Sequence, residues 1–311
     1  MSLHYLVKTI FKDLEEDHFK ILRILEKNMR KYEVVPQEVI VRQSNLDESS
    51  IEKLVKKLNL YKLIWSPRGR TKGYILNYNG LDLLALNNLV KKNLVESIGK
   101  SLGVGKEADV YEALSPSGEN IALKFFRIGR TSFKGYGKKR PSLSLIHSHL
   151  HASMEAARRE FQALKILHPE GVAVPEPIAR EKHIVVTKIF RGVEISSAQF
   201  IKDPSKIFSK ILDNIIRMYN SGIVHSDLSI YNILVTQSEE IVIIDWPQWV
   251  RIDHPMAHVY LSRDLTNLIK YFRRRWRINI IQREYQDFID KILGETFNTA
   301  KDKNLLKGVS G

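Results

Sequence analysis

The sequence predicts an α+β fold, and two observations lead to that prediction. Residues 1–95 carry apolar side chains at helical spacing with one short hairpin, whereas residues 97–126 contain three strand-like segments separated by turns. A mostly helical remainder follows from about residue 197. With 311 residues, 43% of them hydrophobic, the chain is long enough for about two domains with cores of their own.

The N-terminal part has the element order of a winged helix. Apolar residues recur at helical spacing in 16–30 and again in 51–58. Two short apolar segments, Leu60–Trp65 and Gly73–Leu76, follow as a hairpin whose loop contains Pro and Gly, and a helix over roughly 79–95 leads out. Such a domain either places a helix and its wing on nucleic acid or serves protein contact, and both readings stay open. The candidate nucleic-acid contacts are Lys53, Lys56, Lys57, Arg68, Arg70 and Lys72.

Composition narrows the class of protein. Lys and Arg number 49 against 35 Asp and Glu, a net charge of +14, which favours nucleic acid, nucleotides or acidic surfaces as partners. No apolar run is long enough to span a membrane, and the N-terminus lacks the apolar stretch of a secretory signal. The absence of cysteine excludes disulfides and thiolate chemistry. We therefore expect a soluble, cytoplasmic protein without a membrane partner.

The second part reads as a β-rich lobe joined to a helical lobe. Strands are expected over 97–104, 107–114 and 119–126, and a helix over 152–167. The strand-like segment His183–Phe190 leads into the helical lobe, which is interrupted by two small strands at Ile233–Thr236 and Ile241–Ile244. The predicted domains are 1–84 for the winged helix, 85–95 for a connecting helix, 96–188 and 189–300 for the two lobes, and 301–311 for a tail.

A glycine-containing loop joins the first two strands of the β-rich lobe. It reads Gly103, Val104, Gly105, Lys106, Glu107 and, after Ala108 and Asp109, Val110. Glycines let backbone N–H groups approach a polyphosphate closely, and the strand–loop–strand setting separates this loop from those that run into a helix. By itself such a loop is often only a turn.

A lysine stands between apolar residues in the third strand. Lys124 follows Ile121, Ala122 and Leu123, and a buried ammonium group needs a counter-charge. Glu160, in the helix that follows, is the candidate partner. The alternative is a strand lysine whose ammonium group reaches solvent.

The most specific signal lies in the helical lobe. His225 and Asp227 are followed by Asn232, and Asp245 ends the next apolar strand. This is the spacing of a phosphotransfer loop, in which the first aspartate orients the acceptor hydroxyl while the asparagine and second aspartate hold Mg²⁺. Carboxylate and amide oxygens suit such a hard cation.

Together these residues resemble the protein kinases and, more specifically, the RIO atypical kinases. Ala108 replaces a loop glycine, and Asp245-Trp246-Pro247 stands where protein kinases have Asp-Phe-Gly, with no Ala-Pro-Glu after it. The preceding winged helix points to the second RIO subfamily. The resemblance covers roughly residues 1–290 and predicts a two-lobed kinase-like fold.

The resemblance implies a serine/threonine kinase and ATPase that uses ATP and Mg²⁺, with Mn²⁺ as a substitute. It implies Asp227 as the catalytic aspartate, Asn232 and Asp245 as metal ligands, and Asp245 also as the site of an aspartyl phosphate. Adenine would meet the backbone of Thr187–Phe190, including Lys188 and Phe190. The segment Thr131–Leu145 resembles the mobile loop of the family, and its candidate autophosphorylation sites are Ser132, Ser142 and Ser144.

The family is associated with maturation of the small ribosomal subunit. The implied partners are therefore the pre-ribosomal small subunit and its rRNA. The alternative is an RNA-binding assembly scaffold that senses nucleotide with little phosphotransfer. Ala108 and Ile230 depart from the usual residues of the family, which leaves the details of phosphate contact in doubt.

Overall fold

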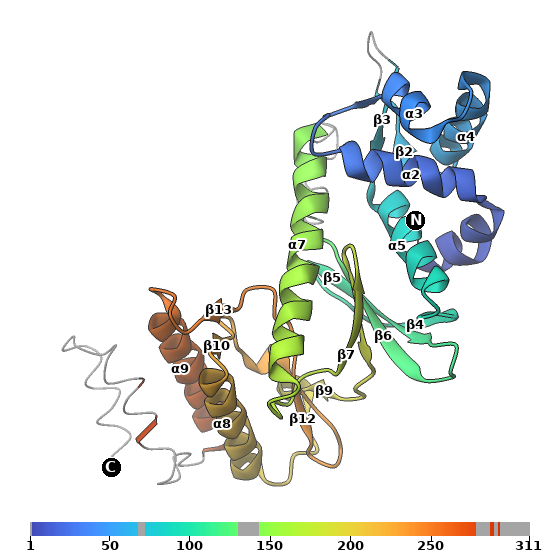
Figure 1. The fold of residues 1–311 in the computed structure, drawn as a ribbon. Helices are drawn as coiled ribbons and strands as arrows, with labels where there is room; N and C mark the ends of the chain where they lie inside the picture. Colours follow the sequence, from blue (N-terminus) through green and yellow to red (C-terminus); the bar gives the residue numbers. More distant parts are fainter. Residues whose placement is uncertain (1, 68–71, 130–142, 278–286, 289–291, 293–311) are drawn as a thin grey trace. The chain divides into compact units, whose positions relative to one another are not determined.

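The computed structural model describes residues 2–67, 72–129, 143–277, 287–288 and 292, with side chains of the long helix described from residue 147. The chain divides into two compact units: Met1–Arg158 with Ala179–Val186, and Arg159–Ile178 with Thr187–Gly311. Figure 1 shows the elements of each unit in sequence colours. No described helix is long and apolar enough to cross a membrane.

The order of helices and hairpin predicted for the N-terminal domain is confirmed by the structure. After a short helical start come α2, α3, α4, the hairpin β2–β3 and α5, and α2 contacts α3, α4 and α5. A short strand β1 completes a sheet of order β1-β3-β2, in which Ile64 pairs with Leu76. The bounds are α1 Leu3–Tyr5, a π-helix Leu6–Ile10, a 3-10 turn Phe11–Asp13, α2 Glu16–Asn28, β1 Val35–Pro36, α3 Gln37–Ser44, α4 Glu48–Leu60, β2 Ile64–Trp65, β3 Gly73–Leu76 and α5 Tyr78–Lys91.

Local sequence explains where these helices begin and end. Asp47 caps α4 by accepting a hydrogen bond from the Ser50 N–H at 2.9 Å, and Asn45 ends α3 in the left-handed conformation. Asn77 caps α5 in the same way, through the Gly80 N–H. Because α5 runs from Tyr78 to Lys91, the predicted domain boundary at residue 84 falls inside a helix.

The β-rich lobe contains a five-stranded sheet of order β4-β5-β6-β8-β7. Its first three strands form an antiparallel meander and agree with the predicted ranges to within a residue. The edge strand β7 was missed because the sequence there is spaced by prolines; Pro177 is its first residue, where a missing N–H is tolerated. The bounds are β4 Ser97–Val104, β5 Ala108–Leu114, β6 Asn120–Phe126, β7 Pro177–Glu181 and β8 Ile184–Lys188.

The helix after β6 is longer than predicted. It was expected over 152–167, but α7 spans Leu143–Leu167. Residues 143–145, which were assigned to a loop by resemblance, therefore belong to this helix. Its apolar residues recur at helical spacing, and Leu150, Ala157, Leu164 and Leu167 are buried.

The helical lobe is built on two long helices that lie side by side, α8 (Pro204–Asn220) and α9 (Ala257–Trp276) (Figure 1). Their contact includes Phe208 and Phe272, both fully buried, with ring centroids 4.9 Å apart. The lobe also contains two small sheets, of order β12-β11-β9 and β10-β13; β9 precedes α8 in sequence and the other four strands lie between α8 and α9. Their strands are β9 Val193–Glu194, β10 Ile223–Val224, β11 Ile233–Val235, β12 Ile241–Ile243 and β13 Val250–Arg251, with 3-10 turns at Ile195–Ser197 and Ile230–Asn232.

Candidate active site

In the first unit, strand pairing aligns three of the predicted nucleotide-binding residues. Gly103 of β4 pairs with Val110 of β5, and Val110 pairs with Lys124 of β6. Residues paired across antiparallel strands point to the same face of a sheet, so Val110 and Lys124 share one face beside the loop. Lys124 is half-buried, and its ammonium group lies 4.8 Å from the centroid of the Phe126 ring.

The loop between β4 and β5 is a tight, exposed turn. The Gly105 N–H donates to the Ala108 carbonyl at 2.8 Å, and residues 103–107 are all exposed. A Cβ on Gly105 would lie 3.2 Å from the Ala108 carbonyl oxygen, so the turn favours glycine there, whereas Gly103 has open space around it. An exposed backbone with a lysine beside it is suited to hold phosphate oxygens.

In the second unit, the residues just before Asp227 fix its loop through contacts with the segment 244–248. His225 lies 3.1 Å from the Ile244 carbonyl oxygen through Nε2, and its ring centroid is 4.4 Å from that of Trp246. Ser226 adopts a positive φ of 65° and donates its hydroxyl to the Gln248 carbonyl at 2.6 Å. Asp227 itself is exposed, so its carboxylate is accessible to a substrate.

The two predicted metal ligands come together because β11 and β12 form a hairpin. Ile233 pairs with Ile243, which places the preceding Asn232 beside the following Ile244, and the Ile244 N–H donates to the Asn232 carbonyl at 2.9 Å. Asp245 comes next, with a positive φ of 72°. A non-glycine residue in this region is uncommon and indicates a backbone held by its surroundings.

The donor set of this hairpin end fits a magnesium ion bound with phosphate. Asn232 donates through Nδ2 to the Asp227 carbonyl at 2.9 Å, so its Oδ1 is the atom that would ligate a metal together with the Asp245 carboxylate. Within the described residues no group of three or more His, Asp or Glu side chains could hold a metal by itself. Two protein oxygens are what Mg²⁺ requires when phosphate oxygens and water complete its coordination.

A buried carboxylate, paired with the arginine that precedes it in the sequence, contacts the Asp227 loop. Asp264 of α9 is 2% exposed and is bonded by its neighbour Arg263, which also donates to the Ser226 carbonyl. Burial raises the pKa of Asp264 to about 6, and the Asp227 charge adds to the rise, while the Leu228 N–H and Arg263 oppose it. The pair therefore supports the backbone of the Asp227 loop.

The C-terminal end of α7 holds the segment after Asp245. Glu160 is buried and accepts the Trp246 N–H at 3.1 Å. Arg159 donates to the Pro247 carbonyl at 2.7 Å, and the Trp249 indole N–H donates to the Arg159 carbonyl at 2.9 Å. Trp246 and Trp249 are therefore core residues of this unit. Lys124 lies in the first unit and Glu160 in the second, so their pairing stays a prediction.

The predicted hinge has one backbone group already in use. The Lys188 N–H donates to the Glu176 carbonyl at 2.9 Å, and its ammonium group pairs with the Glu176 carboxylate at 2.8 Å. An adenine would therefore meet other backbone groups of this segment. Phe190 is half-buried two residues later.

Several predicted residues lie outside the described residues or have side chains that are not described. Ser132, Ser142, Arg68 and Arg70 fall outside, and Ser144 belongs to α7 by its backbone alone. Of the remaining basic candidates, Lys53 and Lys56 are exposed on α4. Lys57 pairs with Asp13 at 3.0 Å and Lys72 with Glu52 at 2.8 Å, so part of their charge is already compensated.

Comparison with known families matches both parts of the chain. A family model described as RIO domain matches residues 109–285, and one described as Rio2, N-terminal, matches residues 11–92. The chain belongs to the RIO domain family. Its N-terminal domain and its relatives identify the Rio2 subfamily within it.

Relatives from archaea and eukaryotes share this RIO domain. The RIO-type serine/threonine-protein kinase Rio2 of Methanocaldococcus jannaschii is 39% identical over 79% of this chain and 92% of its own length. Serine/threonine-protein kinase rio2 of Dictyostelium discoideum is 34% identical over 89% of this chain but 53% of its own length. The chain thus spans about half the length of that relative, and of the RIO2 of Caenorhabditis elegans, at 51%.

Solved structures show the same fold. The Rio2 kinase–ADP/Mg²⁺–phosphoaspartate complex from Chaetomium thermophilum has a TM-score of 0.80 at 28% identity and covers 96% of each chain. The crystal structure of the Rio2 kinase from the same organism has a TM-score of 0.79, also at 28% identity, and covers 97% of this chain and 96% of that one. The predicted α+β fold, a winged helix followed by a kinase-like RIO domain, is confirmed.

Proposed function

We propose that this chain is an ATP- and Mg²⁺-dependent RIO-type serine/threonine protein kinase and ATPase. The observation that carries the proposal is the network in which Asn232 bonds to Asp227 by its side chain and to Ile244, next to Asp245, by its backbone. The proposal is also supported by the cross-strand pairing in the other unit, which aligns Gly103, Val110 and Lys124. The relatives named as serine/threonine-protein kinases support it further.

The chemistry follows from the roles of these side chains. The exposed Asp227 carboxylate orients an acceptor hydroxyl and accepts its proton as the oxygen attacks the γ-phosphorus and ADP leaves. Lys124 places a positive charge against the phosphates, and the backbone of the Gly103–Val110 loop surrounds them. Mg²⁺ held by Asn232 and Asp245 would neutralise phosphate charge.

A second outcome of the same site is ATP hydrolysis through Asp245. In that route the Asp245 carboxylate attacks the γ-phosphorus, ADP leaves, and water cleaves the acyl phosphate to free phosphate and the carboxylate. The phosphoaspartate in the Chaetomium Rio2 complex supports this route. The positive φ of Asp245 shows a backbone held in an uncommon conformation at this position.

The deciding experiment follows γ-labelled ATP with Mg²⁺ through the purified chain and the variants Asp227→Ala and Asp245→Ala. Asp253→Asn serves as the matched control, because Asp253 lies in the same lobe, is 69% exposed and pairs with Arg251 at the surface. A hydroxylamine-labile label that requires Asp245, with release of phosphate, indicates the ATPase route. Acid-stable label on serine that requires Asp227 indicates the kinase route.

The same experiment tests the alternative of a nucleotide-sensing scaffold. If ATP binds but neither label nor free phosphate depends on Asp227 or Asp245, the enzyme assignment is wrong. Mapping acid-stable label by mass spectrometry tests Ser132, Ser142 and Ser144 as autophosphorylation sites. Replacing Mg²⁺ with Mn²⁺ in the assay tests whether Mn²⁺ can substitute for Mg²⁺ as the cofactor.

For the biological setting we propose a cytoplasmic protein that acts on the precursor of the small ribosomal subunit and its rRNA. The net charge of +14 and the exposed Lys53 and Lys56 support an RNA partner. Cosedimentation of the chain with small-subunit precursors, with and without ATP, tests it. Sedimentation at the position of free protein under every nucleotide condition would remove the ribosomal assignment and leave the enzymatic one intact.

A further inference from the structure

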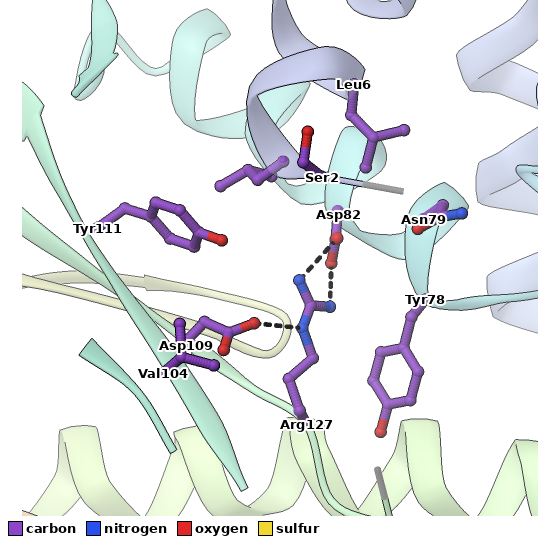
Figure 2. A pocket seen from close by; sticks show the side chains of 10 residues that line it. Ser2, Leu6, Tyr78, Asn79, Asp82, Val104, Asp109, Tyr111 and Arg127 are labelled. Atoms are coloured by element: carbon purple, nitrogen blue, oxygen red, sulfur yellow. Dashed lines mark hydrogen bonds and ion pairs between the residues drawn. The ribbon is translucent and has the colours of Figure 1, made fainter. Parts of the chain in front are cut away.

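A buried guanidinium joins the N-terminal domain to the strand that follows the glycine loop. Arg127, directly after β6, is held by both oxygens of Asp82 on α5, at 2.5 and 2.7 Å. Its Nε lies 3.5 Å from the carboxylate of Asp109 at the start of β5. Figure 2 shows the guanidinium between the two carboxylates. The side chains of Arg127 and Asp109 are each 10% exposed and that of Asp82 only 3%, so the three form one buried cluster.

Neighbouring groups fix the cluster further. His183 approaches Asp82 with Nε2 at 2.8 Å, and the rings of Tyr78 and Phe125 lie 5.3 and 5.4 Å from the guanidinium carbon. Burial by itself would raise the pKa of Asp82, but the Arg127 charge and the His183 hydrogen bond outweigh it and lower the pKa. Asp82 and Arg127 are therefore both ionised, and a substitution that removes either one leaves the other charge buried without its partner.

Arg127 also touches the glycine loop through its backbone. Its N–H donates to the Glu107 carbonyl at 2.5 Å, and Asp109, held by its side chain, pairs with Val104 across the loop. Arg127 therefore holds the end of the loop that leads into β5 at two positions: Glu107 through its backbone N–H, and Asp109 through its side chain. The loop residues 103–107 are exposed to solvent, so the backbone contact at Glu107 and the ion pair at Asp109 hold the buried side of an exposed loop.

A pocket of about 380 Å³ lies against the same cluster. Val104 of the loop lines it together with Asp109 and Tyr111, and the opposite lining comes from the N-terminal domain (Figure 2). The N-terminal lining residues are Ser2, Leu3, Leu6, Tyr78, Asn79 and Asp82. Arg127 lines this pocket as well, so its ion pairs with Asp82 and Asp109 lie where the N-terminal domain meets the loop strands.

We propose that Asp82, acting through Arg127, is a positioning residue for the Gly103–Val110 loop, so that the N-terminal domain sets the affinity for nucleotide phosphates. The inference rests on the proposed nucleotide site. Asp82 is buried against Arg127 and His183 and acts through Arg127, not on the nucleotide itself. A loop held in its binding conformation loses less entropy when phosphate binds, which is the source of the expected affinity.

The test compares ATP with adenosine, because only ATP uses the loop. Calorimetry on the full chain with Mg²⁺ gives the ratio of the two affinities for the wild type, Asp82→Asn and Asp109→Asn. We expect both variants to lower ATP affinity by about tenfold while adenosine affinity is unchanged. Glu16→Gln is the matched control: Glu16 forms an exposed ion pair with Lys91 on the same helix as Asp82, and the ratio should not change.

A purely structural role gives a different result. In that case Asp82→Asn lowers the melting temperature but the folded protein keeps the wild-type ratio, and the inference is overturned. If Asp82→Asn does not fold, Asp109→Asn decides, since it keeps the Asp82–Arg127 pair. If the wild-type protein binds no ATP, the proposed function itself is wrong. If the wild type and the folded variants bind ATP with equal affinity, only this inference is wrong.

Hydrogen exchange provides a measurement that needs no variant. ATP binding to the wild type should slow amide exchange in 103–110 and also in α5, because the cluster couples the two segments. Slowed exchange in 103–110 with no change anywhere in α5 would overturn the inference.

Discussion

The side-chain amide of Asn232 donates a 2.9 Å hydrogen bond to the main-chain carbonyl of Asp227. The bond spans five residues of one loop and fixes which atom of Asn232 faces outward. Because the amide nitrogen is bound to the loop, the amide oxygen is the atom that would face a cation. The loop thus couples the position of Asp227, the proposed catalytic aspartate, to that of Asn232, the proposed metal ligand.

This coupling makes Asn232 more important than a single metal ligand would be. We expect Asn232→Ala to lower Mg²⁺-dependent phosphate transfer by at least about 100-fold, since both a ligand and the loop bond are lost. Steady-state turnover at varied Mg²⁺ measures it. Gln237→Ala, in the turn at the opposite end of the same hairpin, is the control and should retain full turnover. Equal turnover of the two variants would contradict the metal assignment.

The raised pKa of Asp264 predicts a specific dependence of stability on pH. Its folded pKa of about 6 lies above the ordinary value of 3.8, so its stabilising contribution is complete below pH 4 and is lost as pH rises through 6. Asp264→Asn removes this dependence. The free energy of unfolding of the variant, relative to that of the wild type, should therefore rise by about 2 kcal/mol between pH 4 and pH 7.

Urea unfolding at several pH values measures that difference. Other carboxylates titrate equally in both proteins and cancel in the comparison. A difference between wild type and Asp264→Asn that stays constant from pH 4 to pH 7 would show that the pKa of Asp264 is not raised in the folded state.

Trp246 is expected to contribute strongly to stability. It is fully buried against His225, its indole N–H donates to the Ile243 carbonyl at 3.0 Å, and its backbone N–H is held by Glu160. Trp246→Ala should cost about 3–5 kcal/mol in the free energy of unfolding. Trp246→Phe keeps most of the buried ring and should cost clearly less. Chemical denaturation of both variants measures the difference, and equal costs would contradict the packing argument.

The lysines of α4 differ in how much charge they offer to RNA. Lys53 and Lys56 are exposed, whereas Lys57 on the same helix is paired with Asp13. We expect Lys53→Glu with Lys56→Glu to weaken RNA binding by more than about tenfold at low salt and to flatten its salt dependence. The control Lys91→Glu changes a lysine already paired with Glu16 and should have a smaller effect. Titrations at several salt concentrations measure both, and unchanged binding would exclude α4 as the contact.

Local patterns were sufficient to predict much of this chain. Helical periodicity located α2, α4 and α5, and the first three strands of the β-rich lobe, β4, β5 and β6, were placed to within a residue, because periodicity and turn residues act over short distances. The spacing of Asp227, Asn232 and Asp245 is likewise a short-range pattern, and it predicts a phosphotransfer loop. Pro177 concealed β7, since a strand that begins with proline lacks the usual pattern.

Tertiary structure decided the contacts between residues far apart in the sequence. Asp82 meets Arg127, 45 residues later, and His183, 101 residues later, and Glu160 meets Trp246 after 86 residues. None of these pairs has a local signature, because a buried charge can be paired by any complementary group that folding brings near. The sequence determined which side chains could carry phosphate chemistry. The folded chain determined which buried groups hold them, because desolvation makes those pairings obligatory.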